Sequence, residues 1–145
     1  MAGQPRRDAD RPEMILVDTS VWVDFLRGVD SPQRRRLHGL IESGEDISIT
    51  GIVLTEILQG IGNEKEYHTL KEYFLAFPIY FPQGAETYTA AAELYRECRK
   101  GGKTVRKTVD CIIAAVCLEN DLTLLHKDVD FDRIAECSEL VCLKA

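Results

Sequence analysis

The sequence has few cysteines, no long apolar run and no excess of positive charge, and each lack excludes a class of protein. Its five cysteines are odd in number and contain no Cys-x-x-Cys pair, so we expect buried reduced thiols rather than a disulfide framework or zinc knuckle. No apolar run approaches the roughly 20 residues that span a bilayer, and no signal-peptide pattern opens the chain. We therefore expect a cytoplasmic protein with no membrane partner.

The charge balance narrows the function classes further. The formal net charge of −6 excludes nucleic-acid binding through bulk positive charge, although it leaves room for a local basic strip. An acidic protein that acts on phosphates needs something to offset the repulsion between negative charges. A bound divalent metal ion is the obvious candidate.

What is present fits one globular domain. The chain has 145 residues, of which 45% are hydrophobic and 29% charged, and this length is enough to bury one sizeable core. Residues 1–13 are polar, contain three Arg and two Pro, and show no apolar period. We predict a disordered extension there and a single domain over residues 14–145.

Short apolar runs typical of buried strands alternate with segments of helical period. Strands are predicted at residues 15–17, 47–50, 79–81 and 122–125, with a fifth candidate at 140–143. Amphipathic segments between them predict helices that begin near residues 19, 32, 52, 64, 88 and 109. Strands separated by helices favour right-handed crossovers. The predicted fold class is α/β: a three-layer α/β/α sandwich with a mostly parallel central sheet of four to five strands.

Acidic residues recur where the predicted strands end. Asp18 directly follows the first strand, and Asp128 comes three residues after Leu125. Asp110 lies in the first turn of a predicted helix, and Glu56 at the edge of an apolar helix face. Ligands of such sheets bind outside the carboxyl ends of the strands. Carboxylates that converge there cannot all stay charged without cations, and Mg²⁺ or Mn²⁺ is the expected cofactor.

Each acid also has a purely structural interpretation. The segment around Asp128 contains Asp130 and Asp132 as well, so the choice between Asp128 and Asp130 as the fourth acid stays open. The number of metal ions is open too. The structural roles of the others are an N-cap for Asp18, a dipole-favoured first-turn acid for Asp110 and a solvated surface acid for Glu56.

Four segments in order give the combined pattern a more specific meaning. They are MILVDTSVWVDFL at the start, LTEILQG around Glu56, TVDCIIAAVC at Asp110 and LTLLHKDVDFD near the end. Together they resemble the PIN-domain family, in particular the VapC toxins of toxin–antitoxin systems, from residue 14 to about 143. The resemblance implies that Asp18, Glu56, Asp110 and Asp128 are catalytic metal ligands, with Ser20 and Asp130 in supporting positions.

The resemblance also implies a function. The implied protein is a metal-dependent endoribonuclease that inhibits growth, is neutralised by a VapB-like antitoxin and forms a homodimer. Carboxylate-held metal ions suit hydrolysis that leaves 5′-phosphate and 3′-hydroxyl ends. A histidine-based ribonuclease would need a pair, and His38, His68 and His126 are widely separated in the sequence.

A basic strip leads directly into Asp110. Residues 96–107, RECRKGGKTVRK, contain six basic residues. The strip predicts contacts to the RNA backbone, whereas the alternative is a solvated helix end, where cations are common. The residues assigned to RNA binding are Arg99, Lys100, Lys103, Arg106 and Lys107.

Other functions compete with the nuclease. A phosphoacceptor signalling domain would want adjacent acids after the first strand, and a phosphatase with an aspartate nucleophile would want an Asp-x-Asp pair. Position 20 is Ser, not Asp, which disfavours both. The remaining alternative is a catalytically silent PIN-like module that binds RNA or protein, although all four acids are present.

Overall fold

The computed structural model describes residues 14–145, so the predicted extension over residues 1–13 lies outside the described residues. Within them, strands and helices alternate as follows: β1 (Ile15–Val17), α1 (Thr19–Arg27), α2 (Pro32–Glu42), β2 (Ile47–Thr50), α3 (Gly51–Gln59), α4 (Glu64–Leu75), β3 (Ile79–Tyr80), α5 (Ala85–Lys100), α6 (Thr108–Asn120), β4 (Thr123–Leu125), α7 (Val129–Glu136) and β5 (Val141–Cys142).

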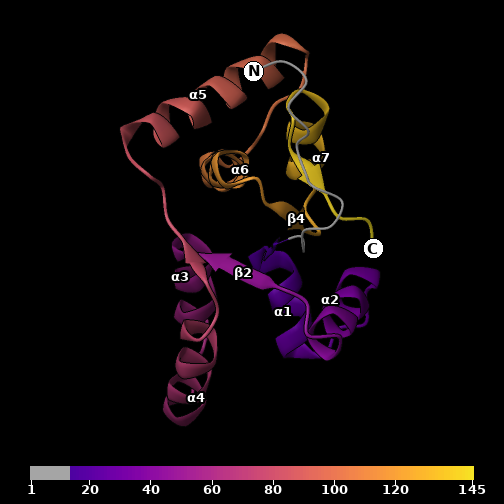
Figure 1. Cartoon of the computed structure of the whole chain (residues 1–145), viewed down its shortest axis with the longest axis vertical. Helices are drawn as coiled ribbons and strands as arrows, with labels where there is room; N and C mark the ends of the chain where they lie inside the picture. Colours follow the sequence, from indigo (N-terminus) through magenta and orange to yellow (C-terminus); the bar gives the residue numbers. More distant parts are fainter. Residues whose placement is uncertain (1–13) are drawn as a thin grey trace.

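The strands form one parallel sheet with the order β3-β2-β1-β4-β5. The central strand β1 pairs with β2, where Ile15 lies opposite Ile47, and with β4, where Leu16 lies opposite Leu124. Figure 1 shows α1 to α4 on one side of the sheet and α5 to α7 on the other. The predicted α/β class with three layers is therefore confirmed. The strand order reverses between β1 and β4, which is where ligands bind in sheets of this kind.

Local signals explain where several helices begin. Ser31 caps α2 by accepting a hydrogen bond from the Arg34 N–H, and Pro32 occupies the first turn. The Asn63 side chain caps α4 in the same way, through the Glu66 N–H. At the other end of α1, Gly28 adopts a φ of 70°, a left-handed conformation that suits glycine.

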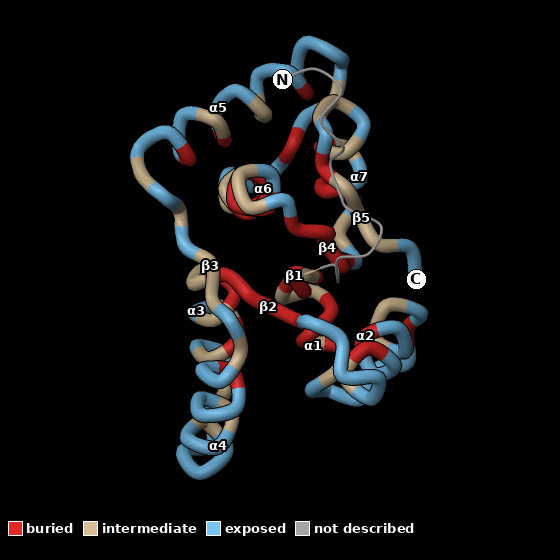
Figure 2. The backbone as a smooth tube through the Cα atoms, viewed as in Figure 1, coloured by how far each residue is buried: buried red, intermediate tan, exposed pale blue. Residues whose placement is uncertain are grey.

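The core lies on both faces of the three inner strands. Every residue of β1, β2 and β4 is buried, whereas β3 and β5 are only partly buried at the sheet edges. On the α1 face, the Trp22 ring meets the edge of Phe74, with ring centroids 4.8 Å apart. Most of α4 is exposed where it extends away from the sheet (Figure 2).

The expectation of reduced thiols is wrong for two cysteines. Cys98, at the end of α5, and Cys137, just after α7, form a disulfide that links positions 39 residues apart in sequence. Cys111, Cys117 and Cys142 are free. None of the described helices combines the length and apolar character needed to cross a membrane.

Candidate metal centre

Asp18 lies between the end of β1 and the start of α1, where it is the N-cap. Its Oδ2 atom accepts hydrogen bonds from the Ser20 N–H at 3.1 Å and from the Ser20 hydroxyl at 2.7 Å. The Ser20 hydroxyl oxygen in turn accepts the Lys127 N–H at 3.0 Å. Asp18 is therefore held at the carboxyl end of the sheet by a link between the loops that follow β1 and β4.

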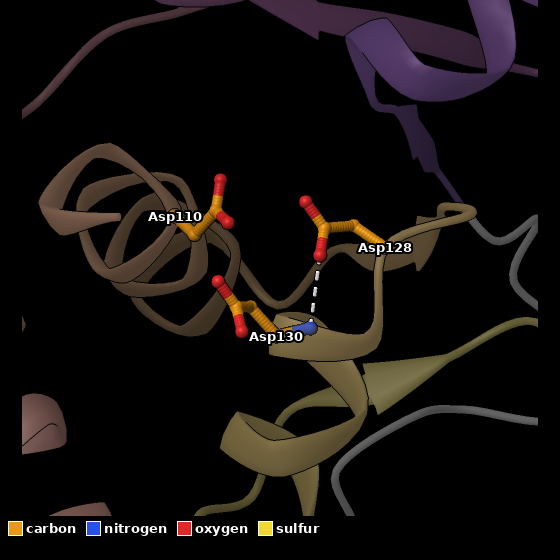
Figure 3. A group of neighbouring side chains, drawn as sticks. All are labelled: Asp110, Asp128 and Asp130. Atoms are coloured by element: carbon orange, nitrogen blue, oxygen red, sulfur yellow. Dashed lines mark hydrogen bonds between the residues drawn. The ribbon is translucent and has the colours of Figure 1, made fainter. Parts of the chain in front are cut away.

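Three further acids converge on the other side of this edge. Asp110 comes from the first turn of α6, Asp128 is the N-cap of α7, and Asp130 lies in the first turn of α7. Each offers a carboxylate oxygen, and these oxygens lie within 4.8 Å of one another. Figure 3 shows the three carboxylates pointing toward a common space, with Asp128 accepting the Asp130 N–H.

Asp110 is the most perturbed of these acids. The residue is 4% exposed, and burial, with smaller contributions from Asp128, Asp18 and Asp130, raises its pKa to about 7 although Lys107 opposes the rise. Its Oδ2 atom has no hydrogen-bond partner within residues 14–145. A buried carboxylate oxygen without a partner is costly, so this atom needs a proton or a cation.

Asp128 and Asp130 differ sharply although they are two residues apart. The Asp130 side chain is fully buried and accepts hydrogen bonds from the Arg133 guanidinium at 2.9 Å and the Arg106 N–H at 3.2 Å. The Asp128 side chain is 14% exposed and lies 2.8 Å from the Lys107 ammonium. Burial is the largest single influence on the Asp128 carboxyl and raises its pKa, but the hydrogen bonds from Lys107 and the Asp130 N–H, together with the charges of Lys107 and Arg106, outweigh burial and lower the pKa.

Glu56 is not part of the three-acid group. It lies on α3 and accepts a 2.7 Å hydrogen bond from the Thr19 hydroxyl, which comes from the residue after Asp18. It also lines a groove of about 270 Å³ between α1 and the end of α3. The structure thus connects Glu56 to the start of α1 through Thr19 and leaves it outside the group formed by the other acids.

The predicted basic strip divides into two parts. Arg106 and Lys107 contact the acids, since the Arg106 Nε atom lies 3.5 Å from Asp130. The other members have partners elsewhere: Lys103 pairs with Glu136, Lys100 with Glu97, and Arg99 lies over the Tyr95 ring. Only two of the five residues assigned to RNA binding therefore touch the acidic group.

The sequence analysis missed three residues that support the site, or gave them too little weight. Arg133 lies three residues after Asp130, a helical spacing that would have revealed the pair had α7 been predicted. The Lys127 ammonium contacts buried Asp24 at 2.7 Å and so fixes the loop after β4. His126 is buried, and its Nδ1 accepts the Asp128 N–H. Burial lowers the His126 pKa, which favours the neutral form that this contact requires.

Comparison with known proteins identifies the family of this chain. A family model described as PIN domain matches residues 15–136. The chain belongs to the PIN-domain family. This PIN domain is 36% identical over 130 residues to VapC ribonuclease Mb1587 of Mycobacterium bovis, with 88% of this chain and 96% of the relative covered. Ribonuclease VapC11 of Mycobacterium tuberculosis matches with the same identity and coverage. The resemblance to the VapC branch is thus confirmed.

A solved structure supports the fold of this PIN domain. VapBC2 from Rickettsia felis, bound to a DNA fragment from its promoter, contains a chain that superposes with a TM-score of 0.68. The two share 18% sequence identity, and the match covers 90% of this PIN domain and 97% of that chain. This comparison concerns the arrangement of strands and helices that brings the acids together.

The donor set fits a hard divalent cation. Every candidate ligand is a carboxylate, which is the oxygen donor that Mg²⁺ and Mn²⁺ prefer. The partnerless Asp110 Oδ2 faces this set and is the atom that most needs a cation. The residues present therefore fit the metal that the family implies.

Proposed function

We propose that this PIN domain is a metal-dependent endoribonuclease that hydrolyses RNA and leaves 5′-phosphate and 3′-hydroxyl ends. The observation that carries the proposal is the convergence of Asp110, Asp128 and Asp130 around a buried carboxylate oxygen without a hydrogen bond. The names of the relatives, which are ribonucleases, support the same reaction class. Mg²⁺ or Mn²⁺ is the proposed cofactor.

The residues divide into ligands and supports. Asp18, Asp110 and Asp128 are proposed as ligands because each projects a carboxylate at the carboxyl end of β1 or β4. Asp130 already accepts two hydrogen bonds from arginines, so we assign it the supporting role and Asp128 the ligand role. Glu56 accepts the Thr19 hydrogen bond through Oε1, so Oε2 is the oxygen that we propose for contact with the metal ion.

Each of these side chains has a defined task. Once bound, the cation would lower the pKa of a water molecule and stabilise negative charge on the phosphate. Ser20 and the Lys127 N–H fix the direction of the Asp18 carboxylate. Arg106 and Lys107, at the mouth of the group, are placed to contact the RNA backbone.

The test is cleavage of RNA by the purified chain without any antitoxin. We expect fragments from total RNA in Mg²⁺ or Mn²⁺, none in EDTA, and 5′-phosphate ends by end-group analysis. Asp128→Asn should abolish cleavage, and Asp132→Asn is the matched control because Asp132 lies on the same helix with its side chain 66% exposed. Ends with 2′,3′-cyclic phosphate would exclude the hydrolytic mechanism, and absence of cleavage with every metal would favour the silent binding module.

We also propose a VapB-type antitoxin as the partner and growth inhibition as the cellular effect. The structural neighbour from Rickettsia felis is a VapBC complex, and the relatives are VapC proteins. Expression of the chain alone should arrest growth, and Asp18→Asn should relieve the arrest. The predicted homodimer stays a prediction that light scattering during size-exclusion chromatography would test.

A further inference from the structure

Lys107 joins two of the clustered acids that come from different helices. It is the N-cap residue of α6, and its ammonium lies 2.8 Å from Asp128 Oδ2 and 3.9 Å from Asp110 Oδ2. The Asp110 oxygen in this pair is the buried one that lacks a hydrogen bond. One ammonium therefore faces both proposed metal ligands at the α6–α7 junction and offsets part of their negative charge.

The two arginines of the site are placed differently. Arg133 and Arg106 contact Asp130, and the Arg106 backbone N–H adds a third bond to the same carboxylate. Because Asp130 is fully buried, removing these partners would leave an unpaired charge inside the protein. The contacts of Arg133 and of the Arg106 backbone N–H are therefore part of the folded structure, whereas the Arg106 guanidinium is 65% exposed and also lies 4.0 Å from Asp128.

Lys107, by contrast, is free to leave. Its side chain is 55% exposed, so its ammonium is able to move into water without opening the core. Lysine is a single charge on a flexible stem, whereas arginine makes a planar fork that favours fixed geometry. Lys107 thus places a positive charge beside the acids on a side chain that can move away from them.

We propose that Lys107 is an exchangeable internal counter-ion, which partly offsets the negative charge of Asp110 and Asp128 until a divalent cation replaces it and which then contacts a phosphate of the RNA. This inference rests on the proposed nuclease function. An ammonium and a divalent cation repel each other strongly when both face the same two carboxylates. Exchange leaves the ammonium at the mouth of the site, where an RNA backbone approaches.

The first test measures metal binding in the absence of RNA. Isothermal titration calorimetry with Mn²⁺ alone should give about tenfold tighter binding for Lys107→Met than for the wild-type chain, because the competing charge is gone. Lys103→Met is the matched control, since Lys103 lies in the same loop but pairs with Glu136. Its Mn²⁺ affinity should stay within about twofold of wild type. Lys107→Arg keeps the charge and should stay close to wild type.

Unchanged or weaker Mn²⁺ binding by Lys107→Met would overturn the exchange, provided that circular dichroism and thermal melting show a folded variant. Equal tightening in Lys103→Met would overturn it too, because the effect would then reflect net charge alone. If Lys107→Met failed to fold, Lys107→Gln would take its place with the same expected direction.

The second test measures RNA cleavage at saturating Mn²⁺. Lys107→Met should raise KM for RNA about five- to tenfold through loss of a phosphate contact, whereas Lys103→Met should raise it less. Equal KM values for the two variants would overturn the phosphate contact. The proposed function fails separately: a wild-type chain that cleaves no RNA would contradict the nuclease, while the comparison of Mn²⁺ affinities would still decide the exchange.

Discussion

The acids of the site are held by different chemistry on its two sides. On the hydroxyl side, formed by Asp18, Ser20, Thr19 and Glu56, each carboxylate accepts a hydrogen bond from a hydroxyl group. On the cation side, formed by Asp110, Asp128, Asp130, Lys107, Arg106 and Arg133, the acids lie against ammonium and guanidinium groups.

The difference separates orientation from charge compensation. A hydroxyl donor fixes the direction of a carboxylate but leaves its negative charge in place. A lysine or arginine fixes direction and also compensates the charge. The carboxylates of the hydroxyl side therefore face a metal ion without a neighbouring hydrogen-bonded cation, whereas the charge on the cation side is partly compensated before any metal binds.

The largest expected effect comes from removing charge on the hydroxyl side. Asp18→Asn should lower RNA cleavage by more than about 100-fold, because a ligand matters more than the groups behind it. Asparagine also caps helices well, so the fold should survive. Cleavage rates with Mg²⁺, beside a thermal melt, measure the two effects. Activity within tenfold of wild type would remove Asp18 from the ligand set.

The next effect is on stability and comes from the cation side. Asp130→Ala should lower the free energy of unfolding by about 3 kcal/mol, because it leaves Arg133 and the Arg106 N–H without their buried partner. Urea unfolding measures the change. Asp132→Ala, on the same helix but mostly exposed, should change stability by less than about 1 kcal/mol. Equal losses of stability in Asp130→Ala and Asp132→Ala would mean that the buried Asp130 contacts stabilise the fold no more than those of an exposed acid.

A pH dependence distinguishes Asp110 from the other acids. Because the pKa of Asp110 is raised to about 7, Asp110 keeps its proton in the folded chain between about pH 4 and 7. In the unfolded chain it loses this proton near pH 4. Stability therefore falls as pH rises through this window. Asp110→Asn should remove the loss and stabilise the metal-free chain at pH 8 by about 2 kcal/mol, with little change near pH 4. Thermal melts in EDTA at both pH values test this. A stability difference between Asp110→Asn and the wild-type chain that is the same at pH 4 and pH 8 would contradict it.

The smallest effects compare the two hydroxyl groups. Ser20→Ala removes the donor to Asp18 and the acceptor for the Lys127 N–H, and should lower cleavage by about tenfold. Thr19→Val keeps the shape but removes the donor to Glu56, and should lower it less than about threefold because Glu56 lies outside the three-acid group. Cleavage rates for both variants in one RNA assay rank them. A larger loss of cleavage in Thr19→Val than in Ser20→Ala would mean that the hydrogen bond to Glu56 matters more for activity than the hydrogen bond to Asp18.

The sequence predicted those parts of the site that depend on local order. Asp18 and Asp128 follow strands, and parallel strands place their carboxyl ends at one edge, so the fold class led us to expect acids there; the structure brings Asp128 and Asp110 together. The resemblance then added Ser20 in its contact with Asp18. The predicted starts of α2 and α4 agreed with the structure because the caps Ser31 and Asn63 are local signals.

The rest depends on contacts that sequence spacing does not report. Helix α7 has eight residues and only two buried apolar side chains, Phe131 and Ile134, so its apolar face is too short to stand out in the sequence. The Cys98–Cys137 disulfide joins ends of helices that meet only in the folded chain. Arg106 and Arg133 pair with Asp130, and Lys107 pairs with Asp128. Which cation pairs with which acid depends on how the three segments that carry these side chains pack together.

The position of β1 has a consequence for protein synthesis. This first strand lies at the centre of the sheet, and its partner β4 begins only at residue 123. The ribosome releases N-terminal residues first, so a nascent chain that ends before β4 contains Asp18 but neither Asp128 nor the Lys127 N–H that holds Ser20. The acidic edge is completed only after the loop that follows β4 has been synthesised. A chain interrupted before that loop lacks part of the site proposed to bind the metal ion.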